Sequence, residues 1–229
     1  MIRAVGVIVP VHDEADLLPA CLAALAGAVA ELPPAIERRV IVVLDACSDR
    51  SAEIAREADV ETVVCDARNV GRARALGAAR VLERFEQRGL ARDAIWLATT
   101  DADTRVPRDW LVEQLRCAEV GAHAVAGAIA VDDWSEHPPG LGERFARFYA
   151  DGGEYHPHVH GANLGVRADA YVVAGGFAPL ATGEDHALWR ALADRPRIAT
   201  RKITVVTSAR RRARAPDGFA GFLVAFAAS

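Results

Sequence analysis

The chain has 229 residues, of which 52% are hydrophobic and 25% are charged, a composition typical of one ordered globular domain and not of a disordered protein. The net charge of -4 gives no overall attraction to nucleic acid, so we expect no nucleic-acid partner. The four cysteines are scattered and form no C-x-x-C pair, which favours reduced thiols and a cytoplasmic location.

The first half of the chain predicts alternating strands and helices. Apolar, β-branched runs predict buried strands over 5–11, 39–45, 60–65 and 95–100. Helical patterns follow Asp16, follow the capping candidates Ser48 and Asp49, and run from Gly71 to Gly89. Such an alternation forms a parallel sheet with right-handed crossovers, and ligands bind beyond the carboxyl ends of its strands. Carboxylates stand at three of these ends.

The second half begins near Pro107 and is less regular. Pro107 suits the first turn of a helix that runs through Trp110 and Leu115. Further elements are expected as strands over 122–131, 162–166 and 198–207 and as helices over 141–150 and 184–193. No linker rich in Pro, Gly or Ser divides the halves, so residues 1–229 are predicted to form one domain with halves over 1–106 and 107–229.

The tail over 218–228 is apolar and follows the basic stretch 210–214. We expect a helix that packs on the core, with peripheral contact at a membrane surface as the alternative. No apolar run approaches the length that crosses a membrane, so we predict no transmembrane segment.

The carboxylate pair Asp101-Ala102-Asp103 follows the fourth predicted strand. Two carboxylates at this spacing can turn toward one cleft and offer oxygen ligands to Mg2+ or Mn2+. Such an ion on a diphosphate stabilises the charge that develops on a leaving nucleotide diphosphate. The alternative is an acidic turn that caps the helix after Pro107.

Two further segments indicate a nucleotide site. Asp45 follows the second predicted strand, where a carboxylate can accept hydrogen bonds from a base or a ribose, while Ser48 or Asp49 as a helix N-cap is the alternative for this turn. The segment 68–74 opens a helix with basic side chains, and helix N-termini favour anions. Arg74 is the favoured nucleotide contact of this segment.

The order of these turns resembles the family-two glycosyltransferases of GT-A fold. The family's Pro-x-x-Asn/Asp-Glu is similar to Pro10-Val11-His12-Asp13-Glu14, and its Asp-Gly-Ser-x-Asp turn is similar to Asp45-Ala46-Cys47-Ser48-Asp49. Its Asn-x-Gly-x-x-x-Arg-Asn-x-Gly element resembles the segment 69–77, in which Ala75 replaces the second asparagine. Later elements resemble Gly161-Ala162-Asn163, Gly175-Gly176-Phe177, Gly183-Glu184-Asp185 and Thr207-Ser208-Ala209-Arg210.

The resemblance implies an α/β GT-A fold, with a Rossmann-like nucleotide-binding half built on a mostly parallel central sheet over 1–106 and a mixed acceptor-binding half over 107–229. It makes Asp101-Ala102-Asp103 the metal-binding motif for Mn2+ or Mg2+, with Asp103 as the direct ligand and Asp101 nearer the ribose or sugar. The implied donor contacts are Pro10, His12, Glu14, Asp45, Asn69, Arg74, Asp101 and Arg210. The implied acceptor contacts are His160, Gly161 and Asn163.

The implied activity moves a sugar from a nucleotide-diphosphate donor, a UDP-sugar in preference to a GDP-sugar, to an acceptor hydroxyl with inversion. Inverting transfer needs a carboxylate that takes the proton of the acceptor hydroxyl, and Asp185 is the candidate. Glu184 is the second catalytic candidate, and it could instead bind acceptor hydroxyls. The alternative makes both residues first-turn acids that complement a helix dipole.

Three alternating histidines, His156, His158 and His160, would point to one side of an extended chain. Metal binding is one interpretation, and a loop of solvated or acceptor-binding histidines is the other. We keep His160 as an acceptor-site candidate because it adjoins Gly161.

Two other functions share part of the pattern. Haloacid-dehalogenase-like phosphatases also place Asp-x-Asp after a strand and use its first aspartate as a nucleophile. Their motif opens the first strand of the domain, whereas three strand-and-helix units precede Asp101. A non-catalytic nucleotide-sugar-binding protein would keep the fold without turnover. The presence of both Asp103 and Asp185 favours an enzyme.

Overall fold

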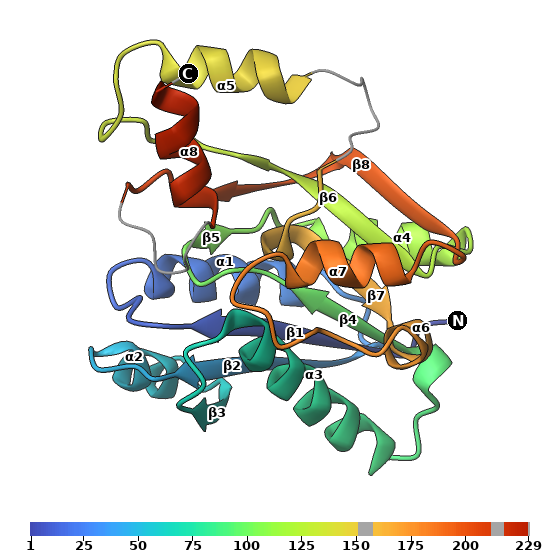
Figure 1. The fold of residues 1–229 in the computed structure, drawn as a ribbon. Coiled ribbons are helices and arrows are strands. Elements are labelled where there is room, and N and C mark those ends of the chain that lie inside the picture. The colour runs from blue at the N-terminus through green and yellow to red at the C-terminus, as the bar shows by residue number, and fades with distance from the viewer. Residues whose placement is uncertain (151–157, 212–217, 229) are drawn as a thin grey trace.

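The structure is a computed structural model that describes residues 1–150, 158–211 and 218–228. These residues form an eight-stranded sheet in the order β3-β2-β1-β4-β7-β6-β8-β5, with helices on both faces (Figure 1). Its N-terminal part is parallel throughout, as expected, and consists of β1 (Ala4–Val11), β2 (Glu37–Asp45), β3 (Glu61–Cys65) and β4 (Ile95–Thr99).

The C-terminal part of the sheet is mixed. It consists of β5 (Thr104–Arg105), β6 (Ala124–Ala130), β7 (Leu164–Arg167) and β8 (Arg197–Thr207). Strand β7 runs antiparallel to both β4 and β6, whereas β8 is parallel to β6 and antiparallel to β5. The first residues of β7 therefore lie at the edge of the sheet where β4 and β6 end.

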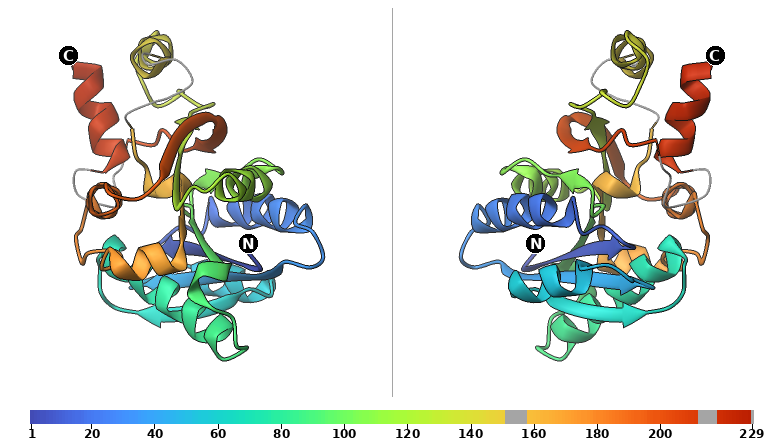
Figure 2. Two further views of the ribbon diagram at one scale, coloured as in Figure 1. Left: turned by 90° about the vertical axis from the view of Figure 1, so that its right-hand side faces the viewer. Right: turned by 90° about the vertical axis from the view of Figure 1, so that its left-hand side faces the viewer.

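Helices cover both faces of the sheet (Figure 2), and a hydrophobic core lies on each face. One face packs against α1 (Leu18–Ala30), α2 (Ser51–Glu57) and α4 (Trp110–Glu119), and the other against α3 (Val70–Glu86), α6 (Ala168–Val173) and α7 (Glu184–Ala191). Side chains of β1 alternate between the cores. Burial on both faces explains why its sequence is a continuous apolar run and does not alternate with polar residues.

Helix α3 lies close against β1 because glycine stands at the contact. A Cβ atom at Gly77 would overlap the side chain of Ile8, and one at the facing Gly6 would overlap Val81. This close approach fixes the start of α3 next to the carboxyl ends of the strands, where Arg74 lines the site.

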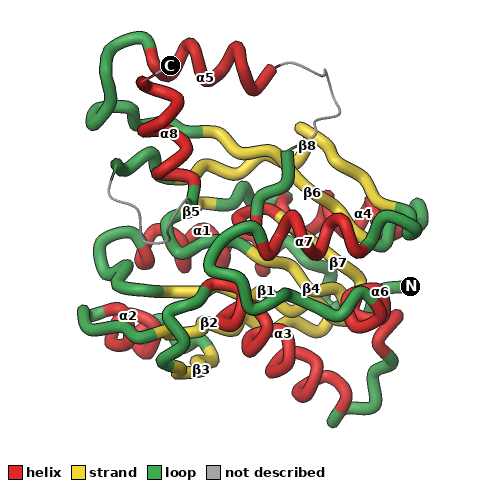
Figure 3. Tube along the Cα trace, in the orientation of Figure 1, coloured by secondary structure: helices red, strands yellow, loops and turns green. Residues whose placement is uncertain are grey.

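Helices α5 (Leu141–Ala150) and α8 (Phe219–Ala228) lie together beyond the carboxyl ends of the strands (Figures 1 and 3). Their contact is aromatic: the ring centroids of Phe145 and Phe219 are 5.9 Å apart, and those of Phe148 and Phe226 are 5.3 Å apart. Leu223 of α8 is fully buried. The expected packing of the apolar tail on the rest of the molecule is therefore confirmed for residues 219–228.

Some predicted boundaries differ from the structure. The strand expected over 162–166 begins only at Leu164, because Gly161–Asn163 form a 3-10 turn. Helix α6 and strand β5 were not predicted. Asp49 is not the N-cap of α2, since Arg50 holds that position. The Asp49 carboxylate instead accepts the N–H groups of Ser51 and Ala15.

A short 3-10 turn, η1 (Arg92–Ala94), precedes β4. Within the described ranges, no helix has the length and apolarity needed to cross a bilayer.

Candidate active site

Residues of both halves line one cavity of about 630 Å3 beyond the carboxyl ends of β1, β2 and β4. The sequence-predicted residues that line it are Pro10, His12, Glu14, Asp45, Asn69, Arg74, Asp101, Asp103, His160, Gly161, Glu184, Asp185 and Arg210. These positions span nearly the whole chain. The fold thus brings together residues that the sequence analysis could associate only through the order of motifs.

Asp103 is largely buried and shares one cation with a second carboxylate. Arg210, which follows β8, donates to Glu14 at 2.5 Å and lies 3.1 Å from Oδ2 of Asp103. Burial raises the pKa of Asp103 to about 6; the nearby carboxylates of Asp101 and Glu14 raise it as well, while Arg210 opposes the rise. Glu14 and Asp103 share this one arginine, and Asp101, which pairs with Arg74, adds a third carboxylate nearby, so this part of the cavity is a favourable place for additional positive charge.

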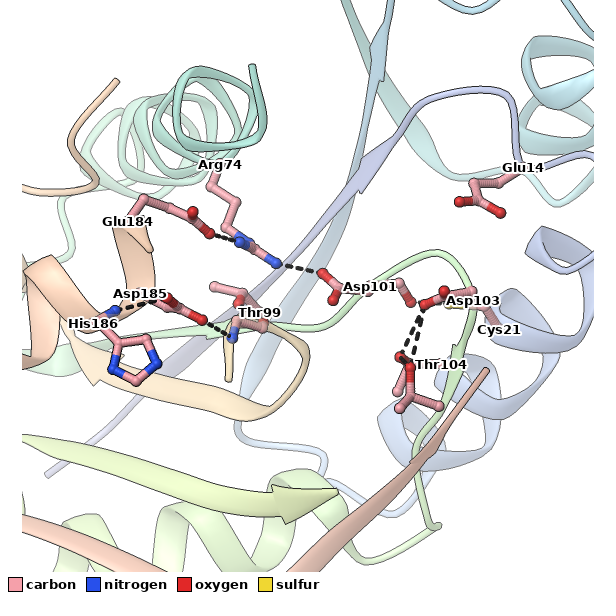
Figure 4. Close-up of polar contacts among 12 residues, drawn as sticks. Glu14, Cys21, Arg74, Thr99, Asp101, Asp103, Thr104, Glu184, Asp185 and His186 are labelled. Atoms are coloured by element: carbon pink, nitrogen blue, oxygen red, sulfur yellow. Dashed lines mark hydrogen bonds and ion pairs between the residues drawn. The ribbon is translucent and has the colours of Figure 1, made fainter. Parts of the chain in front are cut away.

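Arg74 connects the end of β4 to the start of α7. Its guanidinium forms ion pairs with Asp101 on one side and with Glu184 on the other (Figure 4). The side chains of Arg74 and Glu184 are only 4% and 2% exposed, whereas that of Asp101 is 36% exposed. Gly161 lies against the guanidinium, where any Cβ atom would overlap it. We call Asp101, Arg74 and Glu184 the ionic bridge.

Asp185 stands next to the ionic bridge and faces the cavity. Its Oδ2 accepts the backbone N–H of Gly161 at 2.7 Å, and its Oδ1 accepts the N–H of His186 at 2.7 Å (Figure 4). A carboxylate offers about four acceptor positions, so these two bonds orient Asp185 and leave it able to accept from a hydroxyl. Glu184 differs, since its buried carboxylate is neutralised by Arg74.

The loop between β3 and α3 is built around Asp45. The buried Asp45 carboxylate accepts the N–H groups of Ala67, Arg68 and Asn69 at 2.7–2.8 Å. Burial raises the pKa of Asp45, but these three hydrogen bonds lower it more, and the net pKa lies below the ordinary value of 3.8. Asp45 therefore shapes the cavity wall: the backbone takes three of its about four acceptor positions, two on Oδ1 and one on Oδ2.

His12 and Asn69 complete this end of the cavity. Nδ1 of His12 lies 2.7 Å from the backbone oxygen of Asp45, which fixes the imidazole at the cavity wall. Asn69 is the N-cap of α3, and its side-chain oxygen accepts the N–H of Arg72. Both contacts fix residues that line the cavity, one directly after β1 and one at the start of α3.

Asn163 does not reach the cavity, unlike its neighbours His160 and Gly161. It is buried, its Oδ1 accepts the indole N–H of Trp110 at 2.8 Å, and its amide nitrogen donates to two backbone oxygens, those of Ala128 and Ile203. These bonds tie β6, β8 and α4 together. We therefore leave Asn163 out of the acceptor site, because its polar atoms already have partners inside the fold.

The sequence analysis missed an aromatic part of the cavity. Its rings come from α5, from the residues before η2 (Gly161–Asn163) and from α8, and they are Phe145, Phe148, Tyr149, His158, His160, Phe219 and Phe222. A signal was present, since positions 145, 148 and 149 share one face of the predicted helix at spacings of three and four. The histidine alternation is confirmed for His158 and His160, whose rings are stacked 6.2 Å apart. His156 lies outside the described residues.

A divalent ion fits this site as one shared with a substrate. Across the residues that the structure describes, no three His, Cys, Asp or Glu side chains form a group that would hold a metal alone. Asp101 and Asp103 nevertheless offer hard oxygen ligands on the same cavity wall. Mg2+ and similar ions are commonly held by one or two carboxylates together with substrate phosphates and water. The donor set suits that arrangement.

GT-A glycosyltransferases have an Asp-x-Asp turn after the fourth strand of such a sheet and an acidic helix start across the same cavity. This chain has both features. The sequence model of Glycosyl transferase family 2 matches residues 6–174, well over half of the chain. The chain belongs to this glycosyltransferase family. None of the curated proteins compared with it matches. Family membership leaves the phosphatase alternative without support.

Solved glycosyltransferase structures share the fold. S. aureus TarS 1-349 in complex with UDP-GlcNAc superposes with a TM-score of 0.66 at 14% identity, over 92% of this chain and 60% of that chain. A Pyrobaculum calidifontis mannosyltransferase in complex with GDP-Man and Mn2+ gives 0.60 at 19% identity, over 99% and 70%. Glucosyl-3-phosphoglycerate synthase from Mycobacterium tuberculosis, in complex with Mn2+, UDP and phosphoglyceric acid, gives 0.61 at 12% identity, over 98% and 77%. The chain thus spans about three fifths of the TarS structure.

Proposed function

We propose that the protein transfers a sugar, with inversion, from a nucleotide-diphosphate donor to an acceptor hydroxyl, with Asp185 as the base. One observation carries the proposal: the Asp101 and Asp103 carboxylates and the oriented Asp185 carboxylate line the same cavity from opposite halves of the chain. A donor diphosphate at the first pair and an acceptor hydroxyl at Asp185 would then meet within it.

For the donor, we propose a UDP-sugar, with a GDP-sugar as the second candidate. The nucleoside would lie in the part of the cavity formed by His12, Asp45 and the loop before α3, and the diphosphate near Asp103. The similar structures carry UDP-GlcNAc in one case and GDP-Man in another, which supports both candidates. Arg210 would approach the diphosphate, because it already lies beside Asp103.

Mn2+ or Mg2+ would be held by Asp103, with Asp101 nearby, and when bound would neutralise charge on the departing nucleotide diphosphate. Two of the similar structures contain Mn2+, which supports this assignment. The chain's own contribution is positional. The ionic bridge holds Asp101 at a fixed orientation, and Arg210 holds Asp103 toward the cavity.

At the acceptor, Asp185 takes the proton of the hydroxyl as its oxygen attacks the anomeric carbon. A new carbon–oxygen bond forms there, the bond to the phosphate oxygen breaks, and the nucleotide diphosphate leaves from the opposite face. Asp185 is the better base of the acidic pair, because Glu184 is buried and paired with Arg74. Glu184 would position α7 instead of binding acceptor hydroxyls.

A screen of UDP- and GDP-sugars with Mn2+ or Mg2+ tests the proposal through metal-dependent thermal stabilisation and nucleotide release. We expect Asp103→Asn to weaken metal-dependent nucleotide binding, and Asp185→Asn to keep nucleotide binding but lose transfer. Absence of binding by any nucleotide diphosphate would refute the donor assignment. A protein that binds donors but consumes none with any acceptor would be a binding module.

A further inference from the structure

We infer that the acceptor is an uncharged aromatic or polycyclic alcohol, bound by its apolar ring system against the aromatic rings of the cavity. This inference rests on the proposed function and specifies the substrate of the same site. It depends on three observations: the composition of the cavity wall, the location of its cations, and the number of hydrogen bonds that the wall can offer.

The aromatic wall consists of the seven rings named above, contributed by α5, α8 and residues 158–160. Tyr149 and His158 stack at 4.5 Å with an interplanar angle of 14°, and Phe145 and Tyr149 stack at 5.2 Å. Tyr149 is thus stacked against both Phe145 and His158, and the three rings line the same cavity as Asp185. Aromatic side chains bind flat rings through offset-stacked and edge contacts.

Apart from histidines, the cations of the described cavity lining are Arg68, Arg74 and Arg210, and none of them belongs to α5, α8 or residues 158–160. All three are paired with carboxylates: Arg68 with Asp66, Arg74 with Asp101 and Glu184, and Arg210 with Glu14 and Asp103. An anionic acceptor would find no arginine or lysine among the described residues of the aromatic wall. A cationic acceptor is disfavoured as well, since Arg201 already lies 5.4 Å from the centroid of the Tyr149 ring.

Hydrogen-bonding capacity argues against a sugar acceptor. The Tyr149 hydroxyl lies 2.6 Å from Nε2 of His160 and accepts the N–H of Ile129, so it is engaged within the protein. Besides the Tyr149 hydroxyl and the ring nitrogens of His158 and His160, the side chains of the wall offer no polar atom. A monosaccharide would bury several hydroxyls against a surface with few partners for them, which costs free energy, whereas an alcohol on an apolar ring presents one hydroxyl to Asp185.

The test uses 2-naphthol as the probe, with methyl glucoside as the sugar alternative and glycerate as the anionic one. Each is incubated with the donor found in the screen, and products are identified by mass spectrometry. We expect a naphthyl glycoside and little product from the other two. Equilibrium dialysis of 2-naphthol without donor measures occupancy of the wall independently of catalysis.

Helix α8 supplies a matched pair of variants. Phe222 and Val224 are both 39% exposed, but only Phe222 lines the cavity. Phe222→Ala is expected to lower kcat/KM for 2-naphthol and its binding by about 10- to 100-fold, because a large apolar contact is lost. Val224→Ala should leave both values unchanged. Neither substitution should alter nucleotide affinity.

The outcomes separate this inference from the proposed function. If nucleotide binds but 2-naphthol neither binds nor reacts, or if methyl glucoside or glycerate is the better acceptor, the inference is overturned. Attachment of the protein to phosphatidylcholine vesicles through Phe222, without naphthol binding, would overturn it too and identify a membrane-facing surface. If 2-naphthol binds in a Phe222-dependent manner but no nucleotide does, the acceptor inference stands and the proposed donor fails.

Discussion

Removal of Arg74 should reveal how much of the fold depends on the ionic bridge. Arg74→Met would leave Glu184 buried with no counter-charge, and breaking a buried pair in this way costs about 3–5 kcal/mol. Asp101 adds little to that value, because its 36% exposed side chain is solvated without Arg74. Glu184→Gln keeps the shape and removes the charge, so we expect a smaller loss of about 1–3 kcal/mol.

The double variant Arg74→Met with Glu184→Gln completes the cycle. With neither charge buried, its loss of stability should be smaller than the sum of the two single losses by at least about 1 kcal/mol. Urea denaturation followed by circular dichroism gives the free energy of unfolding for all four proteins. Arg72→Met on the same helix is the control, because Arg72 is exposed and its replacement should change stability by less than about 0.5 kcal/mol.

The result that would refute this reasoning is additivity. If the single losses sum to that of the double variant within about 0.5 kcal/mol, Arg74 and Glu184 do not stabilise one another. The same conclusion follows if Arg74→Met is no more damaging than Arg72→Met.

Three more variants probe other parts of the site. Gly161→Ala should displace the Arg74 guanidinium and lower transfer more than nucleotide binding, and unchanged kcat would contradict this. Asn163→Ala should destabilise the fold by about 1–3 kcal/mol in a melting experiment, while the folded protein keeps its KM for the acceptor. A raised KM with unchanged stability would instead place Asn163 in the acceptor site. Asp45→Asn should cost about 1–3 kcal/mol at neutral pH. Because the folded pKa of Asp45 lies below 3.8, its stabilisation is complete above that value and lost as pH falls through the folded pKa. The wild type and the Asp45 variant should therefore converge in stability only in strong acid, and convergence near pH 6 would refute the assignment.

The sequence was sufficient to predict the parallel strands of the first half and several residues that line the cavity at their carboxyl ends. Continuous apolar runs predict strands buried on both faces, and the carboxyl ends of parallel strands must share one edge, so Asp45 and Asp101 were expected near each other. Their detailed roles were not accessible. Whether a carboxylate meets ligand or backbone depends on loop geometry, and three amide N–H groups surround Asp45.

Contacts between distant segments account for the remaining differences. Arg74 and Glu184 are 110 positions apart, so only the fold shows that the predicted donor arginine neutralises the predicted second catalytic acid. Asn163 directly follows the cavity residues 158–162 in sequence, yet the 3-10 turn directs its amide into the core. The aromatic wall combines rings from separate helices, which no local pattern could associate.

The reversed direction of β7 has a consequence for how such an enzyme can diversify. Strand β6 ends, and β7 begins, at the edge of the sheet where β4 also ends. The connection between them, residues 131–163, thus leaves and re-enters the sheet beside the reacting groups, and it carries α5 with its share of the aromatic rings. Under the proposed function, exchange of this one segment would alter the acceptor side of the cavity while the pairing of β1 with β4, and with it the proposed donor side, stays intact.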